Sequence, residues 1–174
     1  MLEAILDTVV VHHLLRGFRP KKDRKSKPRA TTALQDIELK LRRKRFRVVA
    51  DNGSGLVSEW HRTCGEENVK QLVIKWSEFD GIKLVQPRTA IEPRRIASML
   101  RNLGFRDAVD KLIVRTALAN GARTLIVSID SDFWDPSTTG RVGDATAPVA
   151  YALRTHLRLS VVITETFLGA IRAA

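Results

Sequence analysis

Cysteine is almost absent from this chain of 174 residues, in which Cys64 is the only one. A single thiol excludes an internal disulfide framework and a zinc site built mainly from cysteines, and it favours a reducing, cytoplasmic setting. The sequence also lacks an apolar run long enough for a transmembrane helix, so we expect no membrane association. The apolar stretch from Leu2 to Leu15 differs from a signal peptide because acids and histidines interrupt it and no basic segment precedes it.

Acidic residues are the second shortage. The chain has 30 Lys and Arg against 19 Asp and Glu, which gives a formal charge of +11. This excess favours a polyanionic partner such as nucleic acid or an anionic membrane, but it does not distinguish an enzyme from a purely RNA-binding module. Residues 16–29 hold eight basic side chains, one acid and two prolines. They predict a mobile basic loop at about 16–30 that would supply affinity for a polyanionic partner.

The apolar residues, 44% of the chain, predict a single domain over residues 1–174 with one sizeable core. Short, nearly continuous apolar runs at 4–11, 46–50, 82–85, 124–129 and 161–164 alternate with segments of helical period. Such runs are typical of strands covered on both faces. The pattern predicts an α/β fold with three layers, α/β/α, around a central parallel sheet of four or five strands.

The predicted helices have recognisable start and stop residues. Apolar stripes at 69–76 and 96–103 indicate two of them, with Pro93 in the first turn of the second. Asp107 is a predicted cap for a helix that ends at Gly121, and Asp144 for a helix over 147–157. A closing helix is expected at 167–171.

Acids lie at the ends of apolar strand runs in three places, which hold Asp7, Asp51, and the pair Asp130 and Asp132. Ligands in α/β sheets bind beyond the carboxyl ends of the strands. A carboxylate inside an apolar segment is costly unless a cation or hydrogen-bond donors satisfy it, and neighbouring carboxylates repel one another unless a metal such as Mg²⁺ is present. Capping of a helix is the alternative for Asp7. The D-x-D pattern of Asp130 and Asp132 also occurs in toprim domains, haloacid-dehalogenase-like phosphatases and some glycosyltransferases.

The segment from Asp110 to Phe133, DKLIVRTALANGARTLIVSIDSDF, resembles the C-terminal half of PIN-domain ribonucleases. In that family an Asp opens a helix of the form D-x-L-I-x-x-T-A-L, a Gly ends it, and a strand leads to S/T-x-D-x-D-F. The family's first acid lies in a D-T-N sequence, which Asp7 and Thr8 match, with Val9 in place of the Asn. A further Glu follows the second strand, and residues 48–60, which include Glu59, are similar. Asp51 is then better explained as a turn residue.

The resemblance implies that Asp7, Glu59, Asp110 and Asp130 are catalytic residues and ligands of Mg²⁺ or Mn²⁺, with Asp132 as a further ligand. Such ions activate water and neutralise charge on a phosphodiester, and the implied reaction is RNA hydrolysis that leaves a 5′-phosphate and a 3′-hydroxyl. Thr8 and Ser128 are expected to support the site. A cationic surface must attract the strand, and the candidates are Arg19, Lys21, Lys22, Arg24, Lys25, Arg43, Arg45 and Arg115.

Other interpretations stay open. One is a PIN-like module with weakened chemistry that holds RNA or a ribonucleoprotein. Another is a toprim-type or phosphatase-type enzyme built on the D-x-D, which would leave the helix that begins near Asp110 unexplained. Analogy with small stand-alone PIN proteins suggests a toxin-type endoribonuclease with an inhibitory, antitoxin-like partner. The oligomeric state is also open, with a homodimer among the alternatives.

Overall fold

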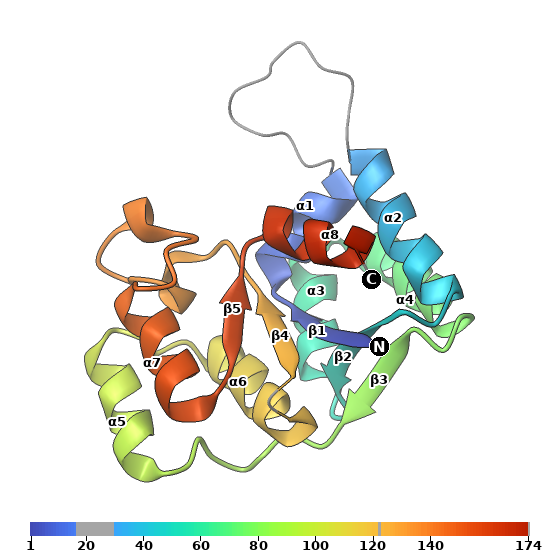
Figure 1. Ribbon diagram of the computed structural model, residues 1–174. Helices are drawn as coiled ribbons and strands as arrows, with labels where there is room; N and C mark the ends of the chain where they lie inside the picture. Colours follow the sequence, from blue (N-terminus) through green and yellow to red (C-terminus); the bar gives the residue numbers. More distant parts are fainter. Residues whose placement is uncertain (17–29, 122, 174) are drawn as a thin grey trace.

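The computed structural model describes residues 1–16, 30–121 and 123–173. Its centre is a sheet of five parallel strands in the order β3-β2-β1-β4-β5 (Figure 1). The strands are β1 (Leu2–Leu6), β2 (Phe46–Asp51), β3 (Ile82–Val85), β4 (Thr124–Val127) and β5 (Ser160–Val162). Helices cover both faces of this sheet, so the predicted three-layer parallel fold is confirmed.

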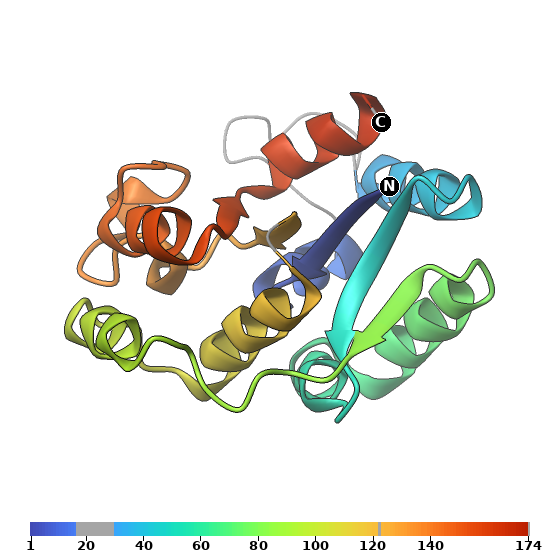
Figure 2. The same ribbon diagram turned by 60° about the horizontal axis from the view of Figure 1, so that its bottom comes forward.

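The helices divide between the two faces (Figures 1 and 2). One face is covered by α1 (Thr8–Arg16), α2 (Ala30–Arg42), α4 (Glu66–Ser77) and α8 (Thr164–Ala173), and the other by α5 (Arg94–Asn102), α6 (Ala108–Asn120) and α7 (Pro148–Leu157). Helix α3 (Gly55–Cys64) contributes to both cores, and two short 3-10 turns, η1 (Ser131–Phe133) and η2 (Thr139–Arg141), follow β4.

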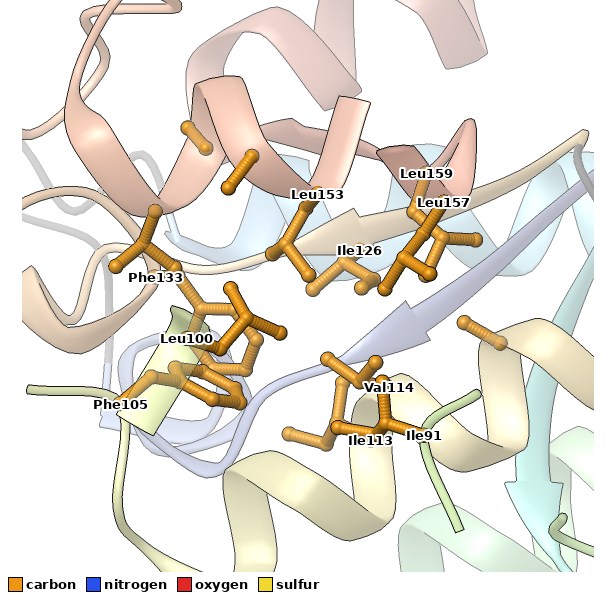
Figure 3. Packing of buried hydrophobic residues seen from close by; sticks show 14 of the residues in the cluster. Ile91, Leu100, Phe105, Ile113, Val114, Ile126, Phe133, Leu153, Leu157 and Leu159 are labelled. Carbon is orange, nitrogen blue, oxygen red and sulfur yellow. The ribbon is translucent and has the colours of Figure 1, made fainter. Parts of the chain in front are cut away.

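Alternation along each strand builds a core on each face of the sheet. In β1, Ala4 and Leu6 face the α1, α2 and α8 side, whereas Ile5 faces the α5, α6 and α7 side. Figure 3 shows the core on the face covered by α5, α6 and α7. There the rings of Phe105 and Phe133 meet edge to face with their centroids 5.4 Å apart. Burying a side chain of this size contributes about 1.5–3 kcal/mol relative to exposure. The two cores therefore hold the strand ends in fixed positions.

Two predicted features are wrong in detail. The strand expected over 4–11 ends at Leu6, because the backbone carbonyl of Asp7 accepts hydrogen bonds from the N–H groups of Val10 and Val11 and so begins α1. Asp144 does not cap α7; its carboxylate accepts from the backbone N–H of Thr146 and pairs with Arg141. In both places the sequence pattern was plausible, but the residue forms hydrogen bonds with groups two to four residues away that the pattern does not reveal.

The paired strands β1 and β4 bring distant residues to one edge of the sheet. Leu6 lies opposite Val127 in the register, so Asp7 and Ser128 leave the sheet side by side. The chain moves outward from β1 through β2 to β3, and then returns to the other side of β1 for β4 and β5. Such a reversal of strand order opens a crevice at the carboxyl ends of the strands. None of the helices in the described ranges is both long and apolar enough to cross a membrane.

Candidate active site

A pocket of about 370 Å³ lies at the carboxyl edge of the sheet beside the ends of β1 and β4. All five acids predicted from the sequence line it: Asp7, Glu59, Asp110, Asp130 and Asp132. Thr8 and Val9 from the start of α1 also line the pocket, as does Asp107 at the start of α6. The structure thus brings together acids from β1, α3, α6 and the segment after β4. We call this the carboxylate pocket.

Asp7 follows β1 directly and is only 4% exposed. The hydroxyl of Ser128 donates a hydrogen bond of 2.6 Å to its Oδ2. Burial raises the pKa of Asp7 to about 6, against the opposing effect of the Ser128 bond and of backbone N–H groups of Thr8 and Val9. Those backbone contacts mean that Asp7 also stabilises the start of α1. Its carboxylate nevertheless lines the pocket, so a role as helix cap and a role as a site carboxylate are compatible for Asp7.

Asp110 lies in the first turn of α6 and is 7% exposed. Asp107 caps this helix as predicted, because its Oδ1 accepts from the backbone N–H groups of Val109 (2.7 Å) and Asp110 (3.3 Å). Burial raises the pKa of Asp110 to about 8, and the negative charges of Asp7 and its other acidic neighbours act in the same direction. Asp110 is therefore largely protonated at neutral pH when no cation is bound.

Asp130 and Asp132 follow β4 and are joined to Asp7 through Ser128. The hydroxyl oxygen of Ser128 accepts a bond of 3.0 Å from the backbone N–H of Asp130 while it donates to Asp7. Asp130 Oδ1 in turn accepts from the N–H of Asp132 at 3.1 Å and caps η1. Burial, followed by the charges of Asp130 and Asp107, raises the pKa of Asp132. Ser128 thus fixes the geometry of both strand ends.

Glu59 differs from the other acids because it already has a cationic partner. Arg62 Nε donates to Glu59 Oε2 at 2.9 Å and Nη2 to Oε1 at 2.5 Å, and the hydroxyl of Thr63 donates at 3.2 Å. The hydrogen bond from Arg62 is the main reason that the pKa of Glu59 is lowered. Arg62 and Thr63 also line the pocket. The sequence does not single out Arg62, although an i, i+3 pair on a helix is the signal by which it could be found.

Helix α3 is held in place by Asp51 and by its contact with α6. The carboxylate of Asp51 accepts from the N–H groups of Gly55 (2.8 Å) and Leu56 (2.7 Å), which explains why Asp51 is buried without belonging to the pocket. A Cβ atom on Gly55 would lie 2.6 Å from Leu112 Cδ2 of α6. The absence of a side chain at Gly55 therefore lets the helix of Glu59 approach the helix of Asp110.

The predicted cationic residues that the structure describes, Arg43, Arg45 and Arg115, do not line this pocket. Arg43 and Arg45 lie between α2 and β2, at the amino edge of the sheet, where the N–H of Leu2 bonds to the carbonyl of Arg45. Arg115 lines a different pocket farther along α6. The other five candidates fall outside the described residues: Arg19, Lys21, Lys22, Arg24 and Lys25. The only cationic side chain of the described chain that lines the carboxylate pocket is Arg62.

The donor set of the pocket consists of carboxylate and hydroxyl oxygens, which Mg²⁺ and Mn²⁺ prefer. As the side chains lie, however, no group of three or more His, Cys, Asp or Glu within residues 1–16, 30–121 and 123–173 is close enough to enclose a metal ion. The residue types fit such an ion, and the side chains would have to turn toward it. Comparisons of the chain with protein-family models, with curated proteins and with solved structures found no match.

Proposed function

We propose that this protein is a PIN-like ribonuclease that depends on Mg²⁺ or Mn²⁺ and hydrolyses RNA at the carboxylate pocket. The observation that supports it best is the burial of mutually repelling acids from distant parts of the sequence, above all Asp7 and Asp110. Such an arrangement lowers the stability of the folded protein unless a cation offsets the repulsion. Strongly perturbed acids of this kind are typical of catalytic sites. In this proposal Asp7, Glu59, Asp110 and Asp130 hold the metal, and Asp132 is a further ligand.

The chain's own residues position the reacting groups. Ser128 orients the Asp7 carboxylate through its hydrogen bond, and Asp107 fixes the start of α6 and with it the backbone of Asp110. The side chain of Arg62 is 75% exposed at the pocket, so its guanidinium is available to a phosphate oxygen of the strand. A bound divalent ion would supply an activated water and neutralise charge that develops on the phosphodiester.

A second candidate is a PIN-like module that binds RNA but cleaves it poorly. Two observations favour it: Val9 puts an apolar group in the pocket where the family has an Asn, and Arg62 already neutralises Glu59. The single cysteine supports a cytoplasmic setting for either candidate. A toxin-type role with an inhibitory protein partner rests on family analogy alone.

Cleavage assays with labelled RNA separate these candidates. Single-stranded and structured RNA, with DNA for comparison, would be incubated with Mn²⁺, Mg²⁺ or EDTA. We expect cleavage of RNA only with metal, and 5′-phosphate products. Asp110→Asn should reduce the rate more than about a hundredfold, since even residues that only support metal ligands are worth 10- to 100-fold.

The matched control is Glu78→Gln, which removes an exposed acid at the far end of α4 and should cleave like the unaltered protein. Circular dichroism would verify that both variants fold. RNA binding without cleavage under any metal would favour the second candidate. Cleavage that persists in EDTA or in Asp110→Asn would refute the proposed site.

A further inference from the structure

A second pocket, of about 300 Å³, lies beside the first on α6. It is enclosed by α5, α6 and residues 89–91 of the connection from β3, which runs along α6 (Figure 2). Three cationic side chains line it, Arg101, Lys111 and Arg115, and no acidic residue of the described ranges does. Apolar residues also line it, among them Ala90, which is exposed, and Ile91, Leu100 and Phe105, which are almost fully buried. We call this the cationic pocket.

The charges of the cationic pocket are not neutralised by acids. Arg115 Nη1 donates to the carbonyl of Thr89 at 3.1 Å, and its Nε is buried without a hydrogen-bond partner. Lys111 Nζ donates to the carbonyl of Arg106. In the described part of the chain, none of the three cations forms an ion pair, whereas Arg62 and Arg141 each do. A concave surface with fixed, unpaired positive charge attracts anions.

The position of this pocket on α6 relates it to the carboxylate pocket. Asp107 and Asp110 line the carboxylate pocket, while Ala108 and Lys111, each one residue further along, line the cationic pocket. Successive residues of an α-helix point about 100° apart. The two pockets therefore open on neighbouring faces of the same helix. A polymeric ligand bound at one pocket can extend into the other.

We propose that the cationic pocket binds a nucleotide of single-stranded RNA that flanks the bond placed at the carboxylates. Its phosphate lies near Arg101 and Lys111, and its base lies over the apolar surface that includes Ile91. We expect an unpaired strand because its bases can enter a pocket without the cost of breaking base pairs. The identity of the flanked bond rests on the proposed function, but the binding itself does not require cleavage.

Binding measured without metal tests this proposal independently of catalysis. A fluorescent single-stranded oligoribonucleotide would be titrated in EDTA against the unaltered protein and against the double variant Arg101→Ser, Lys111→Ser. Kd should rise by roughly tenfold or more, and the slope of log K against log salt should flatten by about 1.4, which is 0.7 for each of two lost contacts.

The charge-matched control is the double variant Arg94→Ser, Arg95→Ser, which removes two exposed cations of α5 that do not line the pocket. A loss of affinity no greater than that of this control would overturn the proposal. Ala90→Leu keeps the charge and adds bulk at an exposed lining position. It should also weaken binding, and unchanged affinity would show that no base enters.

Free nucleoside monophosphates distinguish an isolated nucleotide from one within a strand. We expect weak competition at most against the oligoribonucleotide. Tight binding of a monophosphate, with oligoribonucleotide affinity unaffected by the Arg101 and Lys111 substitutions, would overturn the assignment to a strand. If binding is lost as predicted but no metal-dependent cleavage occurs, the proposed nuclease is refuted and the proposed RNA-binding pocket is retained. If cleavage occurs but Kd does not change with these substitutions, the pocket is refuted and the nuclease is retained.

Discussion

Asp110 and Lys111 are neighbours on α6, yet they serve two pockets of opposite charge. Asp110 is almost fully buried among other acids, and this environment raises its pKa to about 8. Lys111 is half-buried and donates to a backbone carbonyl, and the cations near it, Arg115 on α6 and Arg101 on α5, do not follow strand ends. The acids of the carboxylate pocket therefore repel one another, and a small bound cation would reduce this repulsion. The cationic pocket holds unpaired positive charge that an extended anion would neutralise.

The largest expected effect concerns the stability of the metal-free protein. The pKa of Asp110 is raised from 3.8 to about 8, so the folded protein keeps a proton that the unfolded chain releases. This contribution is fully present below about pH 4 and is lost as the pH rises toward about 8. Asp110→Asn has no such proton, so between about pH 5 and pH 8 it should lose about 3–4 kcal/mol less free energy of unfolding than the unaltered protein.

Urea denaturation in EDTA at both pH values measures this difference. Lys111→Gln, at the neighbouring position, should change the free energy of unfolding by no more than about 0.5 kcal/mol at either pH. If Asp110→Asn retained the full pH dependence, repulsion would not distinguish the two pockets. Added Mn²⁺ should restore stability to the unaltered protein at the higher pH and much less to Asp110→Asn.

A smaller effect is expected from Ser128→Ala, which removes the hydroxyl that joins Asp7 to the backbone of Asp130. Loss of a group that orients a metal ligand should lower the cleavage rate by about 10- to 100-fold. Oligoribonucleotide binding in EDTA should be unchanged, because Ser128 is not part of the cationic pocket. Ser98→Ala on α5 is the control. Equal losses of binding and cleavage would mean that the pockets are not separate in function.

The smallest effect is expected from the predicted basic loop, which lies outside the described residues and is judged on its charge alone. Replacement of Lys21, Lys22, Arg24 and Lys25 by Ser should raise KM and flatten the salt dependence of binding, with little change in kcat. Arg43→Ser, at the amino edge of the sheet, should alter neither as much. A collapse of kcat with an unaltered salt slope would contradict a role in affinity.

The parallel sheet was predictable because each strand depends on local sequence, and the grouping of the acids was expected from their places after such strands. β3 occupies residues 82–85 as expected from its apolar run, although as an edge strand it is only partly buried. Asp7 and Asp130 follow such runs, and parallel strands place their carboxyl ends at one edge. Their proximity follows from the strand order that the structure shows, whereas their role as metal ligands stays a prediction.

Side-chain pairing and the second pocket could not be predicted in the same way. The basic residues Arg43 and Arg45 look suitable for RNA in sequence, but only the strand direction shows that they face away from the acids. The cationic pocket depends on the contact between residues 88–89 and Arg115, more than 20 residues apart in a region without regular pattern. Composition reveals the charge of a chain, and tertiary contacts decide where that charge is concentrated.

The central position of β1 has a consequence for the order in which the molecule is made. Asp7 directly follows β1, but its hydrogen-bond partner Ser128 directly follows β4, 121 residues later in the chain and beyond β2 and β3. Contacts between such distant residues form late and slowly in folding. A growing chain thus has no complete carboxylate pocket until residue 132 has been made. The proposed nuclease would remain inert until these late residues had been translated, while its messenger RNA is within reach.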